Sequence, residues 1–191
     1  MRRRITQSAV LKPLSYLLIE HEQLRWFNVT LPGLLTLGFV ATFVVLSPHV
    51  NILGEGGLIA SINSSIGFLI GFYIAALAAV ATFEHKSLDK KIAGKPAVFT
   101  YYQAAKKWDE ELTRRKFLSF LFGYCSFVSI ILFVAGVFAQ IFHDGIKLLI
   151  PIQYHLLLTG IFVAGYMFVF FNLIITTFLG LFYLTDRLHR N

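Results

Sequence analysis

The sequence predicts an all-α, polytopic integral membrane protein with four transmembrane helices. Of its 191 residues, 57% are hydrophobic and only 14% are charged, whereas charged residues make up about 25% of soluble globular domains. Four apolar stretches without an internal Asp, Glu, Lys or Arg lie at residues 26–46, 61–83, 117–142 and 156–183. Each has the ~20 residues that a helix needs to cross a bilayer. These observations exclude a soluble enzyme and a disordered chain, and they place residues 1–191 in a single membrane domain.

The positions of the basic residues predict the orientation of the four helices. All of the 17 Lys and Arg residues except Lys147 lie in residues 1–25, in residues 84–116 or beyond residue 183. Loops on the cytoplasmic side of a membrane are enriched in Lys and Arg. We therefore expect both ends of the chain and the basic loop 84–116 to face the cytosol (N-in, C-in).

Residues 11–25 precede the first predicted span and carry leucines near helical spacing. Leu14, Leu17, Leu18 and Leu24 fall on one side, and Glu20 falls on the other. This pattern is typical of an amphipathic helix on the inner leaflet, but a short helix that packs on the rest of the protein would have the same pattern. Both alternatives stay open at this stage.

The second and fourth spans contain polar residues that could line a cavity. Ser61, Asn63, Ser64 and Ser65 open the second span, and Asn172 lies inside the fourth. The serine-rich start could line a water-filled vestibule or could face lipid headgroups. Asn172 could line a cavity too, but we favour a hydrogen bond between helices, because amides in membrane helices commonly serve that purpose.

The rest of the second span carries a stripe of small residues. Gly67, Gly71, Ala75 and Ala79 follow each other at intervals of four, so they share one face of a helix. Small residues allow another helix backbone to approach closely. We predict that this small-residue stripe packs against a helix, and we favour a helix of the same chain over one of a second copy.

The basic loop 84–116 is predicted to be helical from about residue 99. Glu110 with Arg114, and Glu111 with Arg115, have the i,i+4 spacing of stabilising pairs on a helix. We expect this helix to continue into the third span and to project into the cytosol. Three roles are open for its basic residues: they could set the topology, bind anionic lipid headgroups or dock a soluble partner.

Three histidines, His49, His143 and His155, are expected near the outer face. They could form a pH sensor or a metal site, but we favour three separate interfacial side chains. Elsewhere the spans offer serines without a charged partner for nucleophilic catalysis. The chain also lacks a phosphate-binding loop and a metal-ligand motif. We expect no enzyme activity, no cofactor and no metal.

Three segments, GFYIAALAAVATF, SLDKKIAGKP and LTRRKFLSFLFGY, resemble parts of small membrane proteins from bacterial anti-phage defence loci. The overall plan is similar to the membrane subunit of the Kiwa defence system. That resemblance implies a homo-oligomer, with a tetramer favoured, which senses phage disturbance at the bacterial inner membrane and holds a DNA-binding effector on its cytosolic face. It assigns effector docking to Lys90, Lys91, Trp108, Arg114, Arg115 and Lys116.

Three functional hypotheses follow from these observations. The first is a non-enzymatic sensor and scaffold that recruits and controls a cytosolic effector. The second is a pore-forming effector that depolarises the host cell, with Ser61, Asn63, Ser65 and Asn172 as candidates for its polar lining. The third is a small membrane protein with a housekeeping role. The expected partners are the lipid bilayer, further copies of the chain and an effector protein. We do not expect direct binding of nucleic acid, because topology and membrane explain the basic residues.

Overall fold

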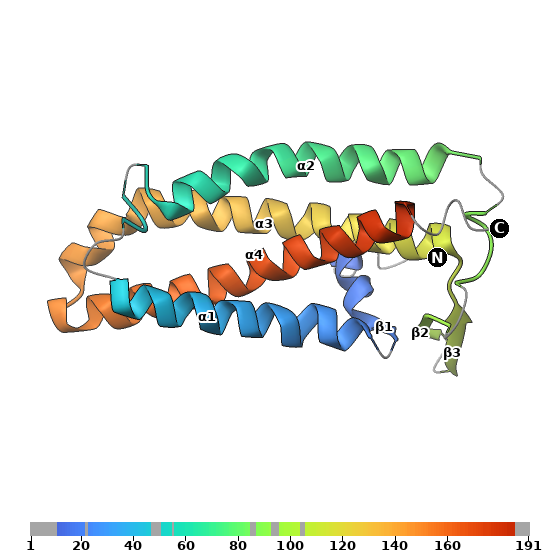
Figure 1. Cartoon of the computed structure of the whole chain (residues 1–191), viewed down its shortest axis with the longest axis horizontal. Coiled ribbons are helices and arrows are strands. Elements are labelled where there is room, and N and C mark those ends of the chain that lie inside the picture. The colour runs from blue at the N-terminus through green and yellow to red at the C-terminus, as the bar shows by residue number, and fades with distance from the viewer. Residues whose placement is uncertain are drawn as a thin grey trace, which may run out of the picture.

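The computed structural model describes residues 11–21, 23–46, 51–54, 56–84, 87–92, 96–103 and 106–185. Four helical segments in this part of the chain are long and apolar enough to cross a membrane (Figure 1). They are η2 Trp26–Thr30 continuing as α1 Leu31–Leu46, α2 Leu58–Thr82, α3 Arg114–Leu149 and α4 His155–Thr185. The four predicted spans are thereby confirmed as helices.

The helix α3 is longer than its predicted span. Its 36 residues extend about 54 Å at 1.5 Å per residue, which exceeds the ~30 Å of a hydrocarbon core. The helix begins at Arg114 because Thr113 caps it: the Thr113 side chain accepts a hydrogen bond from the backbone N–H of Lys116 at 3.3 Å. Most of the additional length therefore lies at its C-terminal end, up to Leu149.

Figure 1 shows how the four helices are arranged. The helix α2 packs mainly on α3, α3 packs on α4, and α1 packs mainly on α4. As a result, α1 and α2 lie on opposite sides of the α3–α4 pair. This arrangement leaves α2 with one face toward α3 and α4 and the other face uncovered.

A small antiparallel sheet lies at one end of the bundle, beside the start of α3 (Figure 1). Its strands β1 Ile19–Glu20, β2 Val98–Gln103 and β3 Lys106–Glu111 have the order β1-β2-β3. The outermost strand is therefore β3. We call this end of the bundle the hairpin end. The opposite end, where η4 Ile152–Tyr154 joins α3 to α4, is called the far end.

The prediction of a helix from residue 99 onward is wrong, because these residues form the β2–β3 hairpin. Phe99 and Thr100 begin a run of aromatic and β-branched residues that favours a strand. Glu110 and Glu111 lie on β3, before the helix begins at Arg114, so the helical i,i+4 spacing does not apply to them. Glu110 instead pairs with Lys116, and Glu111 pairs with Lys91.

Residues 11–21 pack on the bundle. The segment η1 Lys12–Leu18 is a 3₁₀ helix with Pro13 in its first turn. Tyr16 is completely buried, with its ring centroid 5.0 Å from that of Tyr124. This contact supports the packing alternative. Leu17 and Leu18 nevertheless point outward and are 50% and 62% exposed, so the segment also presents the apolar surface that an interfacial position requires.

Candidate functional site

The interior of the bundle contains a network of hydrogen bonds centred on Asn172. Its side chain is 4% exposed. Its Oδ1 accepts from Tyr124 Oη at 2.7 Å, and its Nδ2 donates to the backbone oxygen of Asn28 at 2.8 Å. The Asn28 side chain in turn accepts from Tyr16 Oη at 3.2 Å. Asn172 thus connects α4 to α3 and η2, which is the helix-joining role that the sequence favoured over cavity lining.

A second amide, Asn63, joins three helices nearer the far end. It donates from Nδ2 to the backbone oxygen of Phe133 on α3 at 3.2 Å, and its Oδ1 accepts from Tyr166 Oη on α4 at 2.7 Å. A third connection joins Tyr73 Oη on α2 to Thr177 Oγ1 on α4 at 2.6 Å. In a bilayer, hydrogen bonds of this kind hold helices together, because apolar burial does not distinguish a helix from lipid.

The polar start of α2 is divided between two faces. Asn63 is buried, whereas Ser61 and Ser65 are exposed on the other side of the helix. The Ser61 hydroxyl donates to the backbone oxygen of Gly57 at 3.2 Å, and the Ser65 hydroxyl donates to the backbone oxygen of Ser61 at 3.3 Å, one turn earlier in each case. Within the described part of a single chain, these residues therefore do not line a common cavity with Asn172.

The small-residue stripe lies on the uncovered face of α2, so the favoured contact within the chain is wrong. Gly67, Gly71 and Ala75 are exposed, and Ala79 is half-buried. A Cβ built on Gly67 or Gly71 would meet no atom within 4 Å. The stripe faces outward because the opposite face of α2 carries the large apolar residues and the hydrogen-bonding side chains that contact α3 and α4. The buried residues of that face are Ile59, Ile62, Asn63, Ile66, Tyr73 and Val80.

Two other glycines allow the close approaches inside the bundle. A Cβ on Gly136 of α3 would lie 2.4 Å from Asn63 Oδ1, and one on Gly180 of α4 would lie 2.8 Å from Leu121 Cδ2. Neither glycine belongs to the stripe predicted from the sequence. The spacing of Thr176 and Gly180 could have indicated one of them, because it is a pair of small residues four apart.

Some of the residues that the resemblance assigns to docking make contacts within the chain, and others have exposed side chains. Arg115 donates to Asp89 through Nε at 2.8 Å, and through Nη1 to the backbone oxygens of Val80 at 2.7 Å and Phe83 at 2.8 Å. It therefore joins the C-terminal end of α2, the loop after it and the start of α3. The hydrogen bond from Arg115 also holds the pKa of the Asp89 carboxyl below its ordinary value. Arg114 beside it is 8% exposed.

Two more assigned residues, Lys91 and Lys116, form ion pairs with β3, through Glu111 and Glu110. The remaining two, Lys90 and Trp108, have exposed side chains, and Trp108 is 53% exposed. Arg115 and Lys116 thus attach α2 and the hairpin to α3. Lys91 joins the loop after α2 to the hairpin, and the side chains of Lys90 and Trp108 remain accessible.

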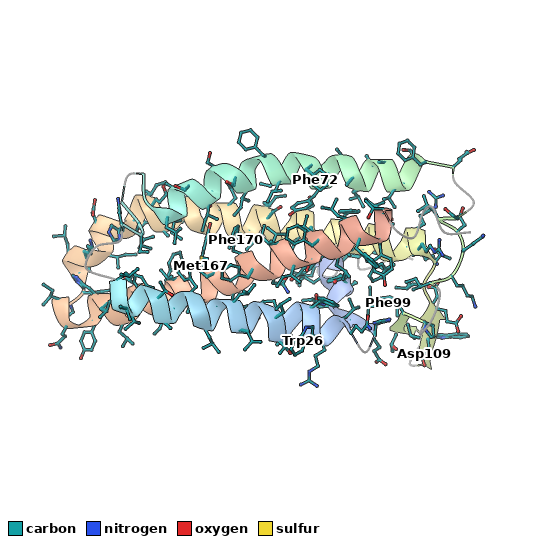
Figure 2. The ribbon with its side chains drawn as sticks, in the orientation of Figure 1. Trp26, Phe72, Phe99, Asp109, Met167 and Phe170 are labelled. Carbon is teal, nitrogen blue, oxygen red and sulfur yellow. The ribbon has the colours of Figure 1, made fainter. Side chains whose placement is uncertain are left out.

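The hairpin is held firmly against the start of α3. The Phe99 ring on β2 lies 5.2 Å from the Phe120 ring on α3, between ring centroids. Asp109 Oδ1 accepts from Thr100 Oγ1 at 2.7 Å and so joins the two strands. Figure 2 shows Phe99 on the side toward the bundle and Asp109 farther out. The bundle therefore presents an ordered surface at this end, with β3 as its outer edge.

At the far end, two of the three histidines come together. His143 on α3 and His155 on α4 line one groove together with Lys147. His49 lies outside the described residues. No three His, Cys, Asp or Glu side chains among the residues that the structure describes are grouped to hold a metal ion.

Four helices of this length and composition define a multi-pass membrane protein. The site geometry adds two surfaces to this class: the hairpin with its edge strand and the groove at the far end. Comparison with protein-family models, curated proteins and solved structures finds no match.

The close approach at Gly136 leads to a stability prediction. We expect Gly136→Ala to displace the Asn63 amide, because the new Cβ would lie 2.4 Å from its Oδ1. The loss of two hydrogen bonds between helices costs about 1–2 kcal/mol, which corresponds to a decrease of about 2–8 °C in Tm. Thermal unfolding of the detergent-solubilised protein measures this decrease.

Gly165→Ala is the matched control, since a Cβ at Gly165 meets no atom within 4 Å. It should leave Tm unchanged or raise it slightly, because Ala favours a helix over Gly. Equal decreases for both variants would contradict the role assigned to Asn63.

Proposed function

We propose that this protein is a non-enzymatic membrane scaffold and sensor that holds a soluble effector at its hairpin end. The observation that carries the proposal is the edge strand β3 with Trp108 53% exposed. An edge strand offers unpaired backbone groups to a partner, and an exposed Trp is a typical anchor of protein interfaces. Attachment to α3 through Phe99 and Glu110 keeps this surface in place.

The proposed location is the bacterial inner membrane, with the hairpin end and both chain ends in the cytosol. The distribution of charge supports this orientation. Lys12, Arg25, Lys90 and Lys91 belong to the segments of the hairpin end, whereas Lys147 is near the far end. The anti-phage role and an effector that binds DNA are proposed from the resemblance of the four-helix plan and of three short segments to the Kiwa membrane subunit.

A sensor needs two packings of its helices that differ by a few kcal/mol. In the proposed mechanism α2 is the element that moves, because only one of its faces is covered by the bundle. Arg115 binds the backbone oxygens of Val80 and Phe83 near the C-terminal end of α2 and also the carboxylate of Asp89. A tilt of α2 would therefore act directly on the start of α3, where the hairpin is attached.

We further propose that copies of this chain associate through the uncovered face of α2, with a tetramer favoured. Gly67 and Gly71 on that face have open space around them. Small residues four apart suit a close contact between helices in lipid. The α3–α4 pair and α1 lie on the other side of α2 and leave this face accessible to a second copy.

The pore hypothesis has weaker support. Asn63 and Asn172, two of its four candidate residues, are engaged in hydrogen bonds between helices. A pore would have to form between chains, with Ser61 and Ser65 on its surface. The scaffold proposal therefore agrees better with the positions of these side chains.

Docking can be tested with Trp108→Ala. We expect recovery of a soluble partner in gentle-detergent purification from the native host to fall about tenfold or more, because an anchoring Trp contributes ~2 kcal/mol or more. Mass spectrometry of the purified complex measures the partner per chain. Trp26→Ala is the matched control, since Trp26 is 51% exposed. Absence of a stoichiometric soluble partner from the wild-type protein, or equal recovery with both variants, would contradict docking at β3.

Association through α2 can be tested with the double variant Gly67→Leu/Gly71→Leu. The larger side chains hold the helices apart, so we expect native mass spectrometry to show a shift from the oligomer toward single chains. Gly165→Leu on α4 adds the same kind of bulk at a position with open space and should keep the wild-type mass. An unchanged oligomer in the double variant would overturn the proposed contact.

A further inference from the structure

A groove of about 420 Å³ lies at the far end between α3 and α4. Its walls are almost entirely apolar, with Phe138 and Phe142 from α3 and Leu158 and Phe162 from α4. The volume is within the ~300–1,000 Å³ of sites that bind small molecules. The size and lining of this groove suit a hydrocarbon chain.

Basic side chains lie along the same groove. His143 and Lys147 are four residues apart on α3, hence on one face of the helix, and His155 begins α4. Among the described residues, no carboxylate forms an ion pair with Lys147. The acidic residue Asp144 acts electrostatically on His143 but is not part of the groove lining.

One nitrogen of His155 is already engaged. Nε2 lies 2.8 Å from the backbone oxygen of Ile150, and a carbonyl oxygen can only accept, so Nε2 is the donor. The Nδ1 atom is therefore the nitrogen through which His155 can meet a ligand. In the neutral ring Nδ1 accepts a hydrogen bond, and in the imidazolium it donates one.

The surroundings of the groove are those of a protein surface in contact with a membrane. Leu148, Leu149 and Ile152, at the turn between α3 and α4, are 85–89% exposed. Apolar side chains exposed to this degree require a covering, which lipid provides at the end of a membrane-spanning helix. Lys147, on the same turn of α3, can extend its ammonium group to the level of the headgroups.

We infer that this groove binds one acyl chain of an anionic phospholipid, with the phosphate at Lys147 and with His143 and His155 beside the headgroup. The apolar walls hold the hydrocarbon, and the ammonium group of Lys147 selects a headgroup with net negative charge over a zwitterionic one. The site lies on α3 and α4 at the end opposite the hairpin. It goes beyond effector docking and does not depend on it.

Lipid retention by the full-length protein tests the inference. Delipidated protein is mixed with phosphatidylglycerol and with phosphatidylcholine of the same acyl chains, and native mass spectrometry counts the bound molecules. We expect the wild-type chain to retain one phosphatidylglycerol with a preference of about fivefold or more, the factor that one basic residue near a membrane surface provides. Lys147→Gln should remove most of this preference, whereas Lys90→Gln at the hairpin end should keep it.

A second variant tests binding of the acyl chain separately from binding of the headgroup. Ala139→Trp places a large side chain in the groove and should reduce retention of both lipids, with an unchanged circular dichroism spectrum as the check on folding. Glycerol 3-phosphate without an acyl chain should not compete. Equal retention of the two lipids by the wild type, equal effects of Lys147→Gln and Lys90→Gln, or full competition by glycerol 3-phosphate would overturn the inference.

Discussion

The hydrogen bonds of Asn63 and Asn172 determine how the four helices meet. In hydrocarbon an apolar side chain is equally well surrounded by lipid or by protein, so apolar burial gives little reason for one helix to prefer another. A buried amide is different, because leaving its donor and acceptor unpaired is costly. Asn172 binds partners on α3 and η2, and Asn63 binds partners on α3 and α4. These bonds fix which face of α2 points inward, and the small-residue stripe faces outward as a consequence.

At the hairpin end, Arg115 has the corresponding role for charged groups. Its guanidinium satisfies two backbone oxygens near the end of α2 and the carboxylate of Asp89. The same turn of α3 carries Lys116, which pairs with Glu110 of β3. The basic loop therefore uses several of its charges to attach α2 and the hairpin to α3. Lys90 and Trp108 are left accessible, so a partner would be recognised mainly by the edge of the sheet and by these two side chains.

Much of the fold could be predicted from the sequence, because the bilayer imposes a simple length requirement on apolar segments. The four spans are present, and Asn172 joins helices as expected. The hairpin could not be predicted from charge spacing: Glu110 with Arg114 has the spacing of a helical pair, but strand pairing with residues 98–103 places Glu110 on β3. The small-residue stripe faces outward because Asn63 and Tyr73, on the opposite face of α2, form hydrogen bonds with Tyr166 and Thr177. These partners are more than 100 residues away in sequence. No local pattern contains that information.

Docking requires that the membrane bundle present the outer edge of the hairpin to a soluble protein. Site-specific photo-crosslinking in intact cells tests it most directly, with a photo-reactive amino acid at Trp108 and, for comparison, at Phe68, which is 82% exposed on α2. We expect a discrete adduct with a soluble polypeptide from position 108 and none with that polypeptide from position 68. If position 108 yields only adducts with lipid or with further copies of this chain, the hairpin is not a docking surface for a soluble protein.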